Sequence, residues 1–163
     1  MIYAGLIRFN DASDKIHELC SVLESYTKTP PTVVRRDSLS LCYGKLSTMH
    51  DKDEVWENTS FVVIGRIFDK EKGSSFGKKE FENLSSSNKE EVLKKIWGKY
   101  VYIQTNEKSS QYEIVTDLTG QLPFFYYPFP DGNVLFSSEI ELIFKVLAQK
   151  PEYNWSYLSS YLI

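Results

Sequence analysis

The sequence predicts one layered α+β domain in which two antiparallel sheets share a core. Its 163 residues fit a single domain, and 15% of them are aromatic, a composition that favours strands with large buried side chains. Several short segments of alternating apolar and polar residues follow one another across tight turns. Tight turns favour antiparallel pairing, and two sheets are needed to bury this many alternating faces.

The first half of the chain begins with a strand over 2–9, whose even-numbered side chains face one way and odd-numbered side chains the other. An amphipathic helix follows, capped by Asp11 or Ser13 and ended before Pro30-Pro31. Its apolar face is formed by Ile16, Leu19, Cys20, Leu23 and Tyr26. Strands are expected over 33–36, 38–46 and 60–69, with a polar connection over 50–60 before the last.

The second half alternates helices with paired strands. A capping box at 87–90 opens a helix that places Ile96 on its apolar face and ends at Gly98. A later helix over 139–147 has Ile140 on its apolar face, and Asn154 caps one more helix in the tail. The remaining expected elements are a loop over 70–79, a short helix around 80–84, strands over 99–105 and 112–117 around a turn at 106–110, and a hairpin joining 123–128 to 133–137.

Charge and composition exclude several classes of function. The formal net charge is −3, without the basic excess of a protein that binds a phosphate backbone, so nucleic acid is not an expected partner. The longest apolar runs, 60–64 and 122–129, are too short to span a bilayer, and the N-terminus lacks the basic region of a signal peptide. Only Cys20 and Cys42 are present, which indicates a reducing compartment, by default the cytoplasm, with both thiols packed as small hydrophobes.

No catalytic constellation emerges from residue types and spacing alone. The chain has no Gly-rich phosphate loop, and its two histidines, His17 and His50, are too few for a His-cluster metal site and are expected at the surface. Two acidic pairs are interpreted as solvated rather than as paired catalytic carboxylates: Asp51 with Asp53, and Glu139 with Glu141.

Several motifs follow one another in a recognisable order. The second half contains Asp117-Leu118-x-Gly120-x-x-Pro123, then Tyr126-Tyr127, then Ser138-Glu139-Ile140, and the strand over 63–68 reads VIGRIF. In this order and spacing they resemble the glutaminase-type domain that begins asparagine synthetases. The resemblance is firm over 60–68 and 97–147.

This resemblance implies a four-layer αββα sandwich of the N-terminal-nucleophile-hydrolase type, with 1–163 as a single glutaminase-like domain. Active members expose an N-terminal cysteine whose own α-amine serves as the base. This chain has Ile2 in that place, and Ile64 in place of the Asn that stabilises the oxyanion. Gly65 keeps a backbone N–H, and Lys45 stands where the family has an Arg for the glutamine carboxylate. The resemblance therefore implies a remnant substrate pocket at Lys45 and Gly65, no catalytic residue and no glutamine hydrolysis.

Within the family, two motifs are most similar to lasso-peptide cyclases, which close a macrolactam on a precursor peptide: Trp97-Gly98-x-Tyr100-Val101 and the segment 117–123. The expected role is a non-catalytic scaffold or docking domain of an ATP-dependent amide-bond-forming enzyme. Its expected partners are the synthetase domain of the same enzyme, a precursor peptide, and a leader-peptide-binding or protease partner. ATP and Mg are expected only in a synthetase domain with an SGGxDS loop, a motif that these residues lack, so no cofactor and no metal are expected in this chain.

Two alternatives stay open. One is a stand-alone module that binds a small molecule or peptide in the remnant glutamine pocket. The other is an active hydrolase that uses an unrecognised residue, for which ammonia release abolished by a change of Cys20 or Cys42 would be the evidence. The aromatic run over 124–129 alternates across a strand, and core packing is the preferred account of each single ring. The candidate interface residues of this run are Phe125, Tyr127 and Phe129.

Overall fold

The computed structural model describes residues 1–8, 15–36, 38–45, 53–57, 61–85, 89–106, 111–148 and 150. Nine strands and four helices lie in these ranges. The strands are β1 (Ile2–Ile7), β2 (Thr32–Arg36), β3 (Leu39–Gly44), β4 (Glu54–Glu57), β5 (Phe61–Asp69), β6 (Ile96–Asn106), β7 (Gln111–Thr116), β8 (Phe125–Pro128) and β9 (Val134–Ser137). The helices are α1 (Ile16–Thr27), α2 (Lys78–Ser85), α3 (Lys89–Lys95) and α4 (Ile140–Val146).

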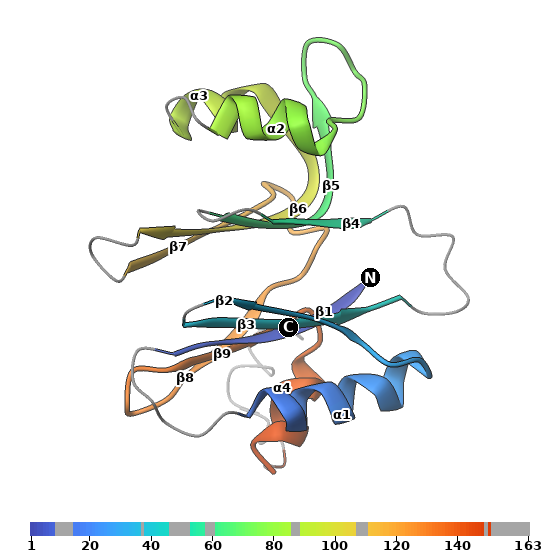
Figure 1. Ribbon diagram of the computed structural model, residues 1–163, viewed down its shortest axis with the longest axis vertical. Helices are drawn as coiled ribbons and strands as arrows, with labels where there is room; N and C mark the ends of the chain where they lie inside the picture. The colour runs from blue at the N-terminus through green and yellow to red at the C-terminus, as the bar shows by residue number, and fades with distance from the viewer. Residues whose placement is uncertain are drawn as a thin grey trace, which may run out of the picture.

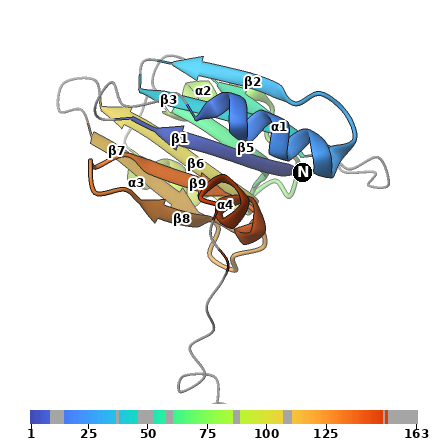
Figure 2. The ribbon, with the colours of Figure 1, turned by 90° about the horizontal axis from the view of Figure 1, so that it is seen from below.

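Two antiparallel sheets lie face to face, and helices cover the outer face of each (Figure 1). The first sheet has the strand order β2-β3-β1-β9-β8 and the second has the order β4-β5-β6-β7. Helices α1 and α4 lie on the first sheet, and α2 and α3 lie on the second (Figure 1). The predicted α+β class with two antiparallel sheets is therefore confirmed. Strand β1 lies in the middle of the first sheet, between β3 and β9 (Figure 2).

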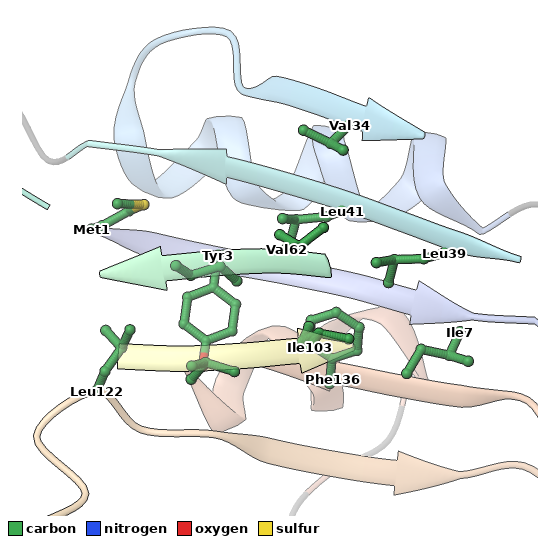
Figure 3. Packing of buried hydrophobic residues seen from close by; sticks show 12 residues of the cluster. Met1, Tyr3, Ile7, Val34, Leu39, Leu41, Val62, Ile103, Leu122 and Phe136 are labelled. Atoms are coloured by element: carbon green, nitrogen blue, oxygen red, sulfur yellow. The ribbon is translucent and has the colours of Figure 1, made fainter. Parts of the chain in front are cut away.

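The predicted alternation of β1 is confirmed, and it lets one strand contribute to two cores. Tyr3 and Ile7 face the second sheet, whereas Ile2 and Leu6 pack beneath the helices on the outer face. Each large apolar side chain buried in this way contributes about 1.5–3 kcal/mol. The core between the sheets also contains Leu39, Leu41, Val62, Ile64, Val101, Ile103 and Phe136 (Figure 3).

A third cluster of apolar side chains holds α2 against the second sheet. The ring of Phe81 meets Phe61 edge to face, with 5.1 Å between ring centroids, and lies 6.0 Å from the ring of Trp56. Tyr102 packs against the same ring at 5.9 Å, and burial raises the pKa of Tyr102 to about 12. These aromatic contacts account for part of the unusual aromatic content of the sequence.

Two expectations about the second sheet are wrong. The polar connection over 50–60 contains the edge strand β4, because Val55 and Trp56 pair with β5 and bury their side chains against the sheet. Helix α3 ends at Lys95 rather than at Gly98, and Ile96 and Gly98 belong to β6. Pairing with nine residues of β5 outweighs the helical spacing that placed Ile96 on a helix face.

Two helix termini also differ from expectation. The N-cap of α1 is Lys15, whose side chain makes no capping hydrogen bond, while Asp11 and Ser13 lie outside the described residues. In α4, Ile140 is 46% exposed, and the buried face is formed instead by Leu142, Ile143 and Val146. Three further predictions fall on residues outside the described ranges: residues 87 and 88 of the expected capping box, residues 107–110 of the expected turn, and the expected helix in the tail.

Among the described helices, none combines the length and the apolar character that a membrane crossing requires.

Candidate functional site

The candidate site lies at the end of the sandwich where β1 begins. Met1 and Tyr3 project from the first sheet toward the second, and Leu122 lies at the same end of the core (Figure 3). On the second sheet, Gly65 of β5 pairs with Tyr100 of β6. The Cβ of any larger residue at Gly65 would lie 3.1 Å from the side chain of Leu122, so the loop between β7 and β8 lies close to β5 here.

A buried charge cluster joins the two sheets at this end. Asp53, directly before β4, has 0% exposure. Its Oδ2 lies 2.7 Å from Nζ of Lys99 on β6 and 3.7 Å from the α-ammonium nitrogen of Met1. A carboxylate this deeply buried is tolerated only with such partners. The interpretation of Asp53 as solvated is therefore wrong, and this side chain holds the start of β1 against the second sheet.

A second buried carboxylate, Asp117, builds the loop that follows β7. Its Oδ1 accepts hydrogen bonds from the backbone N–H groups of Thr119 and Gln121, at 3.1 and 3.0 Å, and from the Thr119 hydroxyl at 2.8 Å. Its Oδ2 accepts one from the N–H of Leu122 at 3.1 Å. Burial acts to raise the pKa of Asp117, but these hydrogen bonds to the ionised form hold it below its ordinary value. The loop thereby positions Leu122 at the candidate site.

Tyr3 ties this loop and β9 to the start of β1. Its hydroxyl donates to the carbonyl oxygen of Pro123 at 2.5 Å, and its backbone N–H donates to Oγ of Ser138 at 3.1 Å. Its carbonyl oxygen accepts from the N–H of Ser138 at 2.9 Å and from the hydroxyl of Ser137 at 3.0 Å. Burial raises the pKa of Tyr3, and the charge of Asp117 adds to the rise. The phenol is therefore a permanent hydrogen-bond donor.

Two glycines with positive φ shape the ribbon formed by β5 and β6. Gly65 has φ 117°, and a Cβ there would lie 2.2 Å from the carbonyl oxygen of Lys99. Gly98 has φ 134°, and a Cβ there would lie 2.2 Å from the carbonyl oxygen of Arg66. Only glycine fits such a conformation with the partner strand this close. Beyond them the ribbon rises away from the first sheet beside α2 (Figure 1).

The predicted site residues occupy separate environments. Ile2 faces the outer helices, and Met1 is the residue at the start of β1 that faces the second sheet. Ile64 has 0% exposure in the core between the sheets. Lys45 is exposed and directly follows Gly44, the partner of Ile2, so it lies at the same end of the first sheet as Met1.

The three candidate interface residues differ in their surroundings. Tyr127 and Phe129 pack against the core beneath the outer helices, where their rings meet edge to face at 5.2 Å. Phe125 is 38% exposed, and its neighbour Tyr126, at 66%, is the most exposed ring of the run. Phe124 stacks on a buried phenylalanine of β9. Core contacts therefore account for Phe124, Tyr127 and Phe129, and Tyr126 is the ring of the run that is most available to solvent.

The thiols and the described histidine are not arranged for catalysis. Cys42 is buried beneath the outer helices with Cys20 beside it. Burial, and in second place the neighbouring Cys20, raises the pKa of the Cys42 thiol, which makes it a poor nucleophile. His17 is exposed on α1, as expected, and His50 and Asp51 lie outside the described residues. In the part of the chain that the structure describes, no group of three or more His, Cys, Asp or Glu side chains is placed to hold a metal ion.

Sequence reasoning missed the charge cluster, although one signal for it was available. Lys99 lies in a strand whose apolar residues Val101 and Ile103 face the inner core, so alternation directs the lysine to the same face. A cation on an inner face requires an acidic partner from another segment. Sequence alone does not identify that partner as Asp53, because the short strand β4 lies in a segment whose composition predicts a polar connection.

No protein-family model matches the chain, and no curated protein sequence matches it significantly. The fold and the site define the class of protein in structural terms only. It is an α+β protein of two stacked antiparallel sheets with a buried charge cluster where its central strand begins.

Proposed function

We propose that the chain is a non-catalytic glutaminase-like domain of an ATP-dependent amide-bond-forming enzyme of the asparagine synthetase family. One observation carries the non-catalytic part of the proposal. The inner position at the start of β1 holds Met1, and the inner position beside Gly65 on β5 holds Ile64. A thioether and an alkyl group supply neither an activated nucleophile nor a hydrogen-bond donor for an oxyanion.

The α-amine of the chain supports the same conclusion. In active members of the family it is the base. Here the α-amino nitrogen of Met1 lies 3.7 Å from the buried carboxylate of Asp53. The contact therefore favours a structural role for this end of β1.

The motifs that carry the family resemblance serve structural contacts in this chain. Asp117 organises the loop that leads to Pro123, and Pro123 accepts the hydrogen bond from the hydroxyl of Tyr3. Ser138 binds both backbone groups of Tyr3. Each contact holds the start of β1 in place. A scaffold role thus explains why these residues are present in a chain that has no nucleophile at the family's position.

In finer detail, we propose that the fold is the four-layer sandwich of N-terminal-nucleophile hydrolases. We propose a lasso-peptide macrolactam cyclase as the parent enzyme. In this proposal the chain covers one side of a synthetase domain, which binds ATP and Mg and forms the amide bond. The order of layers in Figure 1 and the central position of β1 are consistent with it. The fold by itself does not specify the reaction.

A glutaminase assay tests the non-catalytic part. The purified chain is incubated with L-glutamine and ammonia is measured, and we expect release no faster than in buffer. Ammonia release that is abolished by Cys20→Ala or Cys42→Ala would overturn the proposal and support the unrecognised-hydrolase alternative.

The scaffold role in the proposal is tested by an assay in which the chain is required for activity. A synthetase chain with an SGGxDS loop from the same genome is assayed for ATP-dependent amide formation with and without this chain, and we expect activity to require it. Equal activity without the chain contradicts the scaffold role. Thermal-shift measurements against the common amino acids address the remaining alternative, because a saturable shift would favour a stand-alone binding module.

A further inference from the structure

The outer end of the β5–β6 ribbon carries cations and aromatic rings side by side. Arg66 lies opposite Lys99 across the two strands, and Phe68 lies opposite Trp97. Strand alternation puts these four side chains on the face that, further along, forms the core between the sheets. The ribbon rises away from the first sheet here (Figure 1), and on this face Trp97 is 52% exposed.

Arg66 is pre-positioned by stacking. Its guanidinium carbon lies 4.8 Å from the centroid of the Phe68 ring, and that ring lies 5.0 Å from the ring of Trp97 at an interplanar angle of 31°. Stacking occupies one face of the guanidinium and leaves the N–H donors at its edge available for an anion. Within the described ranges, Arg66 makes no ion pair. A guanidinium ordered by stacking in this way is suited to bidentate recognition of a carboxylate.

The local charge balance favours an anionic ligand. Like charges directly opposite each other in a sheet are destabilising, and Asp53 compensates Lys99 at 2.7 Å but makes no ion pair with Arg66. Further out, Lys70 and Lys95 are both exposed, and a backbone hydrogen bond of 2.9 Å joins them. This end of the ribbon is therefore cationic in a chain whose formal net charge is −3.

Asp69, the carboxylate at the end of β5, is already engaged within its own turn. Oδ1 of Asp69 accepts hydrogen bonds from the backbone N–H groups of Glu71 and Lys72, at 2.8 and 3.0 Å. Its Oδ2 lies 3.9 Å from Nζ of Lys72. Asp69 thus closes its own turn, and the cations of the ribbon stay available to an external anion.

We propose that the cationic strip formed by Arg66, Phe68, Trp97, Lys70 and Lys95 binds an extended acidic peptide segment. One carboxylate of the peptide accepts hydrogen bonds from Arg66, an apolar side chain packs on Trp97, and a second carboxylate reaches the two lysines. From residue 66 to residue 70 a strand advances about 13 Å, which matches side chains i and i+4 of an extended peptide. The intermediate side chain i+2 then lies over the indole ring.

A peptide fits this strip better than a nucleic acid does. The cations occur as two small groups separated by aromatic rings, whereas a phosphate backbone is bound by a larger basic excess. An apolar side chain between two carboxylates uses both the charges and the exposed indole. The proposal does not depend on the amide-ligase assignment, because it uses none of the residues of the remnant glutamine pocket.

Titration with synthetic peptides tests the proposal. The full chain, labelled with 15N, is titrated with acetyl-Glu-Ser-Leu-Ser-Glu-amide while the indole N–H signal of Trp97 is followed by NMR. That signal is assigned by its loss in Trp97→Phe. We expect a saturable shift that weakens with added salt. The neutral peptide acetyl-Gln-Ser-Leu-Ser-Gln-amide is expected to bind at least tenfold more weakly.

Variants locate the binding on the strip. Arg66→Gln is expected to weaken binding of the acidic peptide at least tenfold, and Arg66→Lys is expected to recover only part of the affinity because a lysine lacks the bidentate fork. Lys79→Gln on the exposed surface of α2 is the matched control and leaves affinity unchanged. The spectra themselves report whether each variant is folded. Equal binding of both peptides, no shift at Trp97, or unchanged affinity in folded Arg66→Gln would each overturn the proposal.

Discussion

Replacing Lys99 with Met removes the closest described cation from a carboxylate that has 0% exposure. The distance from Lys99 Nζ to Asp53 Oδ2 is 2.7 Å, and the α-ammonium of Met1 remains 3.7 Å away. Removing one partner of a buried ion pair costs about 3–5 kcal/mol. Protonating a carboxylate at pH 7 instead takes about 4 kcal/mol, which limits the loss. Because Met1 still compensates part of the charge, we expect Lys99→Met to lower the free energy of unfolding by about 3 kcal/mol.

Replacing Asp53 with Asn should cost less, although it breaks the same ion pair. The side chain of Lys99 is 34% exposed, so its ammonium can turn toward water when the carboxylate is removed. We therefore expect Asp53→Asn to lower the free energy of unfolding by about 1–2 kcal/mol. The double variant should lose less stability than the sum of the losses in the two single variants.

Urea denaturation at pH 7, followed by far-UV circular dichroism, measures these differences. The free energies are compared by linear extrapolation for the wild type, both single variants and the double variant. A larger cost for Asp53→Asn than for Lys99→Met, or strictly additive costs, would refute the asymmetric burial on which the reasoning rests.

Three further predictions follow from the same end of the molecule. Asp117→Asn should lower the free energy of unfolding by about 2 kcal/mol at neutral pH. Because the folded pKa of Asp117 lies below its ordinary value, the carboxylate contributes fully above its ordinary pKa and loses its contribution as the pH falls through the lowered folded pKa, so the melting temperatures of wild type and variant should converge in acid. Gly65→Ala should lower the free energy of unfolding by about 3 kcal/mol. Gly73→Ala is the control: Gly73 has φ 65° and nothing lies within 4 Å of its added Cβ, so the loss should be only about 1 kcal/mol. Equal losses in urea denaturation would contradict the close approach of β5 and β6. Ile2→Cys should release no ammonia from glutamine, because residue 2 faces the outer helices and Ile64 donates no hydrogen bond.

Local patterns predicted the elements whose side chains alternate strongly. The alternation of residues 2–7 put Tyr3 and Ile7 on one face and Ile2 and Leu6 on the other, and the two cores divide them in the same way. Pairing of β8 with β9 likewise follows from the hairpin signal between them. In these segments one periodicity dominates, so local sequence is sufficient.

Prediction failed where a distant partner decides the conformation. Ile96 has helical spacing with the residues before it, yet it pairs with Asp69 and becomes the first residue of β6. Gly98 looks like a helix terminator, but its φ of 134° serves the close contact with β5 instead. Both outcomes depend on hydrogen bonds to a strand about 30 residues earlier in the chain, and such pairing overrides local preference.

The candidate site shows the same limit more sharply. Asp53 stands in a polar run and looks solvated, but its burial depends on Met1 and Lys99, which lie at opposite ends of the first hundred residues. Likewise, Arg66 stacks on Phe68, two residues along the same strand, but Trp97 reaches the ring of Phe68 only after β5 and β6 pair.

The sequence by itself determined the α+β class, the two antiparallel sheets and the faces of the strongest strands, because these follow from periodicity and turn chemistry within short windows. Tertiary structure alone decided which charged side chains are buried, which glycines bend the β5–β6 ribbon, and which aromatic rings stay exposed. Those properties arise from contacts between segments far apart in the chain, and a pattern within one segment does not contain them.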